Sequence, residues 1–258
     1  MLTSSPVRHA GIGIFIPQVF WYFPRKDTKK MKNIKKSLFL FLSILPFLLA
    51  AENYSLLCQE GGQAYKAKKF ELALEKYSRA HKVAGTPAQK FRIIPVQITL
   101  YQQLKKTAEL EKFLETERKN DAYDNRQLRY LLNWNARIHI WPRRNMDHAM
   151  KLLNMARLLQ VPPADNIYFD TFFLLGEIYY RNKQYDYVIH YLSPLPEIKN
   201  FHPSNSYKIS MQVGRAYRAK GDRKTALQWF EKALAFGKKV PYKYNYSDAE
   251  RYIKELSK

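Results

Sequence analysis

The sequence predicts an all-α protein, built as a solenoid of about five helical hairpins and closed at its C-terminal end by a capping helix. Two observations lead to this prediction. Prolines punctuate the chain between helical segments, and no segment has the alternating pattern of a strand. Small or apolar residues also recur at intervals of 37, 39, 39 and 38 residues, at Ala73, Leu110, Ala149, Val188 and Ala226.

The composition of the 258 residues excludes several classes of protein. Hydrophobic residues make up 46% of the chain and aromatic residues 15%, which is too much apolar surface for an unfolded chain. The single cysteine, Cys58, excludes an intramolecular disulfide and a cysteine-based zinc site, because both need at least two thiols.

Residues 31–51 have the pattern of a secretory signal peptide. The basic segment MKNIKK, which starts at Met31, precedes fifteen uncharged residues from Ser37 to Ala51. As a helix, fifteen residues would span about 22 Å, less than the roughly 30 Å hydrocarbon core of a membrane. A cleaved signal is therefore favoured over a permanent anchor, while the cleavage site and the retention of an anchor stay open.

Residues 1–30 contain a second apolar stretch, interrupted by Gly11, Gly13 and Pro17. Since a signal peptide begins at its own methionine, we expect translation to start at Met31 and residues 1–30 to be an unstructured overlong gene start. An organellar leader is the alternative. The remaining residues, 52–258, contain 36 Lys and Arg against 21 Asp and Glu, a formal charge of +15.

The clearest hairpin lies in the segment VGRAYRAKGDRKTALQWFEKAL. Gly214 and Ala233 are small enough for two helices to approach, Tyr217 and Phe230 fill the space between them, and Gly221 lies in the turn. This series of glycine, aromatic, alanine, aromatic and alanine resembles the tetratricopeptide repeat. The resemblance implies a right-handed superhelix without catalytic activity, whose first helices line a concave groove that binds proteins.

Four earlier segments are similar to this hairpin. The first copy has Gly61, Phe70, Ala73, Tyr77 and Ala80, and the fourth has Gly176, Tyr179, Val188 and Leu192. The second copy aligns through Ile98, Tyr101, Leu110 and Leu114, and the third through Arg137, Ile140, Ala149, Leu153 and Ala156. The alternative is a helical bundle without repeats. Residues 52–258 are thus predicted to form the repeat domain.

A final helix is predicted over residues 247–258. Ser247 and Glu250 have the spacing of a capping box, which would begin this helix. A polar last helix is what a stacked array needs to cover its apolar end.

The sequence contains no motif of a catalytic site, a phosphate-binding loop or a metal centre. The histidines of residues 52–258 are isolated from one another: His81, His139, His148, His190 and His202. We therefore expect no enzymatic activity, no metal and no cofactor. An enzyme with an unrecognised site is the alternative, and a deep polar pocket lined by titratable groups would favour it.

The geometry of tetratricopeptide arrays assigns a set of aromatic, amide and guanidinium side chains to the groove. These candidates are Arg92, Gln102, Trp134, Asn135, Trp141, Tyr180, Arg181, Arg215 and Arg218. Aromatic planes and guanidinium groups suit extended peptides that carry carboxylates or aromatic side chains. Packing between repeats is the alternative role for the tryptophans, and exposure to solvent is the alternative for Arg215 and Arg218.

Taken together, these patterns predict an exported adaptor of a bacterial envelope or periplasm that binds a protein or peptide in its groove. The alternative function is a basic surface that binds an anionic polymer or nucleic acid. Nucleic acid is the weaker choice, because an exported chain would meet little of it and no repeated base-reading pair is visible. Peripheral association with an anionic membrane or envelope polymer is also compatible with the charge.

Overall fold

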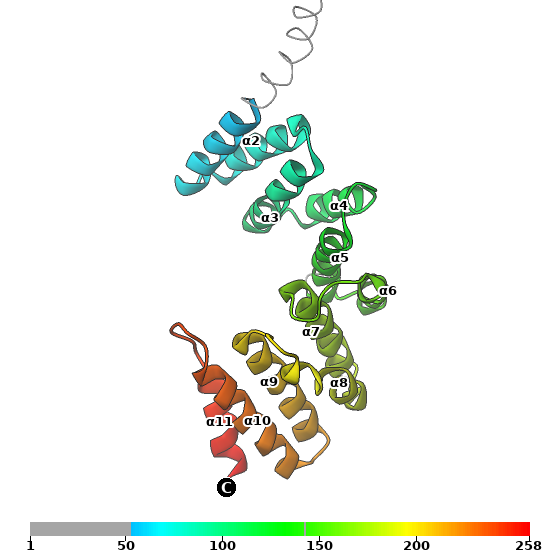
Figure 1. Cartoon of the computed structure of the whole chain (residues 1–258), viewed down its shortest axis with the longest axis vertical. Helices are drawn as coiled ribbons and strands as arrows, with labels where there is room; N and C mark the ends of the chain where they lie inside the picture. The colour runs from blue at the N-terminus through cyan, green and yellow to red at the C-terminus, as the bar shows by residue number, and fades with distance from the viewer. Residues whose placement is uncertain (1–52, 142) are drawn as a thin grey trace, which may run out of the picture. The chain divides into compact units, whose positions relative to one another are not determined.

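The computed structural model describes residues 53–141 and 143–258 (Figure 1). All of them belong to one compact unit. The expected overlong gene start or leader (1–30) and signal peptide (31–51) lie outside the described residues. No described helix is long and apolar enough to cross a membrane.

Within the described ranges the regular structure is helical throughout, and its helices pair into five hairpins. The pairs are helix 53–66 with α2 (Phe70–Val83), α3 (Pro87–Gln103) with α4 (Thr107–Glu117), α5 (Asn125–Ile140) with α6 (Met146–Leu158), α7 (Asn166–Arg181) with α8 (Tyr185–Leu192), and α9 (Pro203–Ala219) with α10 (Arg223–Lys238). A 3-10 turn, η1 (Leu195–Glu197), precedes α9, and α11 (Ser247–Leu256) ends the array. The predicted all-α solenoid of five hairpins and a C-terminal helix is confirmed.

The five repeating positions identified in the sequence are all interior positions. Ala73, Ala149, Val188 and Ala226 are fully buried, and Leu110 is 2% exposed. Five residues before each of them, the chain adopts a positive φ of 53–88°, at Lys68, Lys105, Arg144, Lys183 and Gly221. Each hairpin therefore turns through the same left-handed conformation, although only the last turn has a glycine there.

One backbone hydrogen bond defines the register of each hairpin. The N–H group just before the second helix donates to a carbonyl five residues earlier in four hairpins, for example from Asp222 to Tyr217. In the third hairpin Asn145 donates instead to His139, six residues earlier, because this turn is one residue longer. The predicted alignment of Arg137 with Gly214 is therefore wrong, and Ala136 occupies that position.

Small residues at the repeat position of Gly214 allow the two helices of a hairpin to approach each other. A Cβ atom added to Gly61 would lie 2.9 Å from the ring of Tyr77, and one added to Gly214 would lie 2.8 Å from the ring of Phe230. Ala136 is fully buried at the equivalent point. The glycine–aromatic contacts predicted for the first and last hairpins are present.

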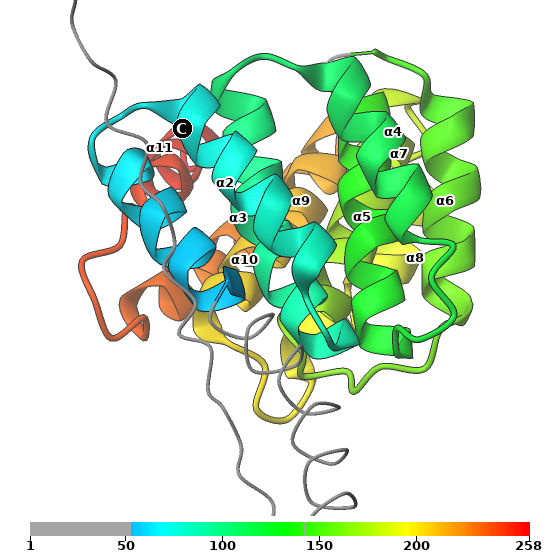
Figure 2. The ribbon, with the colours of Figure 1, turned by 90° about the horizontal axis from the view of Figure 1, so that it is seen from above.

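The hairpins stack through one continuous series of buried clusters. The largest cluster joins α5 to α9, and α5 packs on both α6 and α7 (Figure 2). The backbones of α3 and α5 lie farther apart than those of α5 and α7 or of α7 and α9, and the two helices contact each other through side chains, such as Phe91 and Tyr130, whose rings lie 5.6 Å apart. This wider spacing leaves room for a pocket between the second and third hairpins.

A buried polar network joins α5 to α7 inside this stack. Arg129 is 1% exposed; its Nε atom donates to the Thr171 hydroxyl at 2.7 Å, and one terminal nitrogen donates to the carbonyl of Leu159. Thr171 in turn donates to Asn133 at 3.0 Å. The Arg129 guanidinium also lies 4.7 Å from the ring of Tyr168, and burial lowers the pKa of Arg129.

The capping helix α11 covers the apolar end of the last hairpin, as predicted. Tyr252 stacks on Phe230 at 4.5 Å, and Ala249 is fully buried. The predicted capping box of Ser247 and Glu250 is absent, because the cap residue of α11 is Tyr246 and its side chain makes no capping hydrogen bond. The N–H group of Ser247 instead donates to the side chain of Asn245.

Candidate partner-binding surface

The nine candidate residues all lie on or directly after first helices of the hairpins. α3 carries Arg92 and Gln102; α5 carries Trp134 and Asn135 and ends before Trp141; α7 carries Tyr180 and Arg181; and α9 carries Arg215 and Arg218. The structure brings six of them into two neighbouring groups and places the other three elsewhere.

The first group forms a pocket of 240 Å³, which we call the tryptophan pocket. It opens where α3 and α5 separate, between the second and third hairpins. Its walls come from the end of α3, the start of α4 and the second half of α5: Tyr101, Gln102, Thr107, Leu110, Trp134, Arg137, Ile138 and Trp141. Trp141 is 40% exposed at the rim, while Trp134 is half-buried. Two indole rings, a phenol and a guanidinium suit an aromatic or aliphatic side chain with a nearby polar group.

The second group surrounds a carboxylate, and we call it the Glu177 cluster. Glu177 accepts a hydrogen bond from Nε of Arg181 at 2.8 Å, and a terminal nitrogen of Arg215 lies 3.9 Å from its other oxygen. The guanidinium of Arg181 lies over the ring of Trp141 at 5.7 Å, and that of Arg215 lies over the ring of Tyr180 at 5.2 Å. Two cations thus share one anion, which leaves the cluster with a net positive charge.

The two groups are joined through shared residues. Trp141 belongs to both, since it lines the pocket and stacks against Arg181. Arg137 lies over the ring of Trp134 at 5.3 Å and pairs with Asp170 of α7 at 2.8 Å. Burial raises the pKa of Asp170, although the nearby Arg137 opposes this effect. A partner along α5, α7 and α9 would meet both groups in succession.

Two candidates lie apart from these groups. Arg92 is exposed on α3, where its charge opposes the burial that raises the pKa of Tyr54 and of Cys58. Arg218 lies 4.8 Å from the ring of Tyr252 and pairs with Glu255 at 3.5 Å, so it connects α9 to the capping helix.

The expectation that Asn135 presents its side chain in the groove is wrong. Asn135 is fully buried, and neither polar atom of its side chain has a hydrogen-bond partner in the described structure. Asn135 directly precedes Ala136, at a position that faces the interior. The equivalent residues Gln97, Leu175 and Val213 are at most 2% exposed.

Sequence analysis missed three residues of this surface: Arg137, Asp170 and Glu177. Glu177 and Arg181 are four residues apart on one helix, a spacing that predicts a side-chain contact. The pair of Arg137 and Asp170 joins two hairpins and depends on how α5 packs on α7. Only the first of these contacts could be predicted from local spacing.

The described residues contain no group of three or more His, Cys, Asp or Glu side chains that could hold a metal ion. The nearest approach is around His139, which lies 3.3 Å from Glu111 and whose ring lies 4.3 Å from that of His148. Burial, reinforced by His148, lowers the pKa of His139.

Comparison with solved structures identifies the fold. The chain is similar to the crystal structure of MamA protein, with a TM-score of 0.53 and 19% sequence identity over 73% of this chain and 94% of that one. It is also similar to the kinesin light chain TPR-like repeats of Podosopora anserina, with a TM-score of 0.53 and 15% identity over 72% and 93% of the two chains. No family model and no curated protein matches the sequence. The tetratricopeptide-like fold predicted from the sequence is thus confirmed.

Proposed function

We propose that the chain is a noncatalytic, exported scaffold that binds an extended segment of another protein along α5, α7 and α9. In this proposal the tryptophan pocket receives an apolar or aromatic side chain of the partner. A carboxylate close to that side chain in the partner's sequence then binds Arg181 and Arg215.

The observation that carries this proposal is the position of Trp141 between the pocket and the Glu177 cluster. An apolar cavity and a pair of guanidinium groups share one wall, so a short peptide can reach both. Arg215 approaches Glu177 only to 3.9 Å, which is too long for a hydrogen bond, and so retains donors for a second carboxylate. The buried aromatic anchor would supply most of the affinity and the charges would supply specificity.

A polyanion-binding surface is the second candidate, because residues 52–258 carry a formal charge of +15. However, the guanidinium groups of this face are occupied by carboxylates of the chain itself: Arg137 by Asp170, Arg181 by Glu177 and Arg218 by Glu255. These ion pairs reduce the positive charge that this face presents to a polyanion.

Peptide selection against residues 52–258, followed by affinity measurements, tests the proposal. We expect selected peptides to combine an aromatic or aliphatic residue with a carboxylate. Trp141→Ala should weaken them about tenfold or more, the effect of losing an aromatic anchor. Tyr242→Ala, which removes an aromatic side chain that is 57% exposed in the loop before α11, is the matched control and should bind normally.

A charge variant tests the role of the Glu177 cluster, and Trp141→Ala together with the salt dependence separates the two candidate functions. Glu177→Gln removes the carboxylate that competes with the partner, so acidic peptides should bind more tightly to it than to the unchanged chain. Peptides that bind the Trp141→Ala variant and the unchanged chain equally well would contradict the scaffold proposal. Affinity that falls by several units of log K per unit of log salt, without any effect of Trp141→Ala, would favour the polyanion surface.

Export is the part of this proposal that rests on the sequence alone. The basic segment from Met31 and the uncharged run to Ala51 support it. Mass spectrometry of the chain recovered from a bacterial envelope tests it, and we expect a mature N-terminus close to residue 52. A cytoplasmic chain that keeps residues 31–51 would contradict export.

A further inference from the structure

The outer face of the first hairpin is exposed, whereas the corresponding face of each later hairpin packs against the hairpin before it. We call this exposed surface of the first hairpin the end face. Leu56 lies five residues before Gly61 and is 53% exposed. Its equivalents in the later hairpins pack against the preceding hairpin and are at most 2% exposed: Ile93, Leu131, Thr171 and Ile209. Among the described residues nothing packs on Leu56 in the same way, so apolar surface that is interior elsewhere in the array is accessible here.

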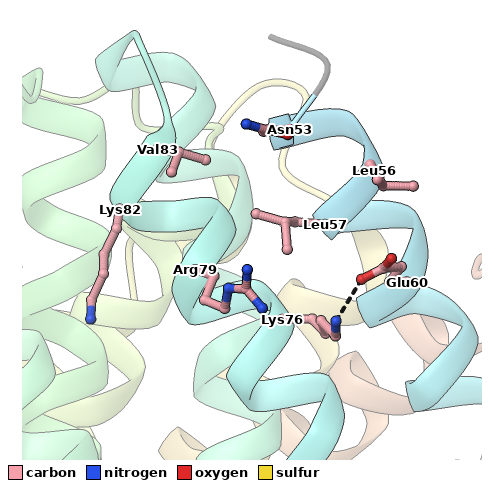
Figure 3. Close-up of a pocket in the computed structure, with 8 residues that line it drawn as sticks. All are labelled: Asn53, Leu56, Leu57, Glu60, Lys76, Arg79, Lys82 and Val83. Carbon is pink, nitrogen blue, oxygen red and sulfur yellow. Dashed lines mark ion pairs between the residues drawn. The ribbon is translucent and has the colours of Figure 1, made fainter. Parts of the chain in front are cut away.

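A pocket of 340 Å³ opens on this face between helix 53–66 and α2 (Figure 3). Leu56, Leu57 and Val83 supply its apolar side, and Figure 3 shows Leu57 pointing into the gap between the two helices. An ion pair of Glu60 and Lys76 at 2.7 Å joins the helices next to these residues. Val83 is 38% exposed, so the apolar part of the face is open at its edge as well.

The rest of the end face is polar, which distinguishes it from a surface made for a further hairpin. Glu60 and Gln63 replace residues that are buried in the other hairpins, such as Leu175 and Ile178 of α7. A hairpin packed here would bury these polar side chains at a cost in free energy. The end face therefore suits a partner that covers its apolar edge and leaves the polar part hydrated.

Basic side chains lie around the apolar edge of the end face, which Leu56, Leu57 and Val83 form. Lys76, Arg79 and Lys82 line the pocket, and residues 53–83 contain six Lys and Arg against three Glu. Lys82 makes no ion pair within the described ranges, and the pair of Arg79 with Glu75 is long, at 3.8 Å, and exposed. These cations are available to an anionic partner.

From these observations we infer that the end face binds the surface of an anionic lipid bilayer. Leu56 and Val83 would enter the interface between headgroups and acyl chains, while Arg79 and Lys82 would contact lipid phosphates. The inference concerns a different surface from the proposed function and does not depend on it.

A second copy of the chain fits the end face less well. In a twofold-symmetric contact the same patch meets itself, so Lys76, Arg79 and Lys82 would be brought close to the cations of the partner's patch. Like charges at such close range disfavour association. An acidic polymer would satisfy the cations but would leave Leu56 and Val83 exposed to water, whereas a bilayer satisfies both.

Vesicle flotation with residues 52–258 tests this inference. The buried clusters of the described residues lie within residues 54–256, so this fragment keeps them. We expect it to float with vesicles that contain phosphatidylglycerol and to stay unbound with pure phosphatidylcholine. The double variant Arg79→Gln/Lys82→Gln should lower the partition coefficient on the order of twentyfold to thirtyfold, at roughly fivefold per charge. Leu56→Ser should lower it roughly fivefold.

Matched variants on other faces serve as controls. Lys224→Gln/Lys238→Gln removes two exposed charges of α10, and Leu158→Ser removes a leucine of α6 that is 78% exposed. Both should float like the unchanged fragment, and thermal unfolding should show that every variant is folded.

Three outcomes would overturn the inference. The first is no flotation with anionic vesicles, and the second is flotation that the end-face and control variants reduce equally. The third is a dimer, seen by light scattering, that Leu56→Ser dissociates while anionic vesicles bind nothing, since the occupant would then be a second copy of the chain.

Discussion

Two adjacent glycines of helix 53–66 are predicted to respond in opposite directions to the same substitution. Gly61 faces the ring of Tyr77, and a Cβ atom there would lie 2.9 Å from two ring carbons. At Gly62 a Cβ atom would lie 3.5 Å from the Tyr77 hydroxyl, an ordinary van der Waals contact. Replacing each glycine by alanine therefore adds the same atom to the same helix in two different environments.

The magnitudes follow from two opposing terms. Alanine is more favourable than glycine inside a helix by about 0.8–1 kcal/mol, and this gain applies at both positions. At Gly61 the added atom also forces the Tyr77 ring or the helix to move, and such overpacking typically costs about 1–3 kcal/mol. We expect Gly62→Ala to stabilise the chain by up to about 1 kcal/mol and Gly61→Ala to destabilise it by up to about 2 kcal/mol.

Thermal unfolding of residues 52–258 by circular dichroism measures this difference. For a domain of this size about 1 kcal/mol corresponds to about 2–4 °C in the melting temperature, so the two variants should be clearly separated. If Gly61→Ala melts at or above the temperature of Gly62→Ala, then close contact with the aromatic ring is not the reason for glycine at this repeat position.

Three further predictions concern the turns, the polar network and a buried histidine. Thr171→Val should destabilise the chain by about 1–3 kcal/mol for each buried partner left unsatisfied, including Nε of Arg129, as measured by chemical denaturation. Lys183→Gly should raise the melting temperature by a few degrees, because the turn holds Lys183 at φ 60°, which costs an L-residue about 1–2 kcal/mol. Burial lowers the pKa of His139, so the unfolded chain takes up a proton more readily. The free energy of unfolding should therefore fall as the pH drops below about 6.5, and His139→Phe should reduce this dependence.

Each of these predictions has a control in the same chain. Thr99→Val removes a hydroxyl that binds only the carbonyl of Pro95 on an exposed helix, and should change stability by less than about 0.5 kcal/mol. Lys239→Gly alters a residue with an ordinary φ of −83° and should not stabilise the chain. His190→Phe alters an exposed histidine and should leave the pH dependence unchanged. A control that behaves like its test variant would refute the corresponding explanation.

Periodicity in the sequence predicted the hairpins because it reflects what each hairpin must bury. The repeating positions, from Ala73 to Ala226, occupy the interior in every repeat, and the glycine of the first and last copies faces the predicted aromatic ring. The third copy was misaligned because a single extra residue lies in its turn, between His139 and Asn145. Spacing counted across a turn cannot detect such an insertion.

The candidate surface was predictable in part. Gln102, Trp134 and Trp141 were selected through the resemblance to tetratricopeptide arrays, whose first helices line the groove, and all three line one pocket. The pocket itself depends on the separation of α3 from α5, which is a property of helix packing and has no local signature. The role of Glu177 as the shared partner of Arg181 and Arg215 also depends on how α7 packs on α9. The sequence therefore supplied the chemical types of side chain, and the stacking of the hairpins determined which of them meet.

The polar network of Arg129, Asn133 and Thr171 has a consequence for how the array assembles. Hairpins with similar apolar surfaces could pair in the wrong order during folding, or could pair with hairpins of another molecule. The interface between the third and fourth hairpins matches three polar groups and so favours this neighbour, since another would leave Nε of Arg129 buried without its Thr171 acceptor. The polar network thus helps to determine the order in which the hairpins stack.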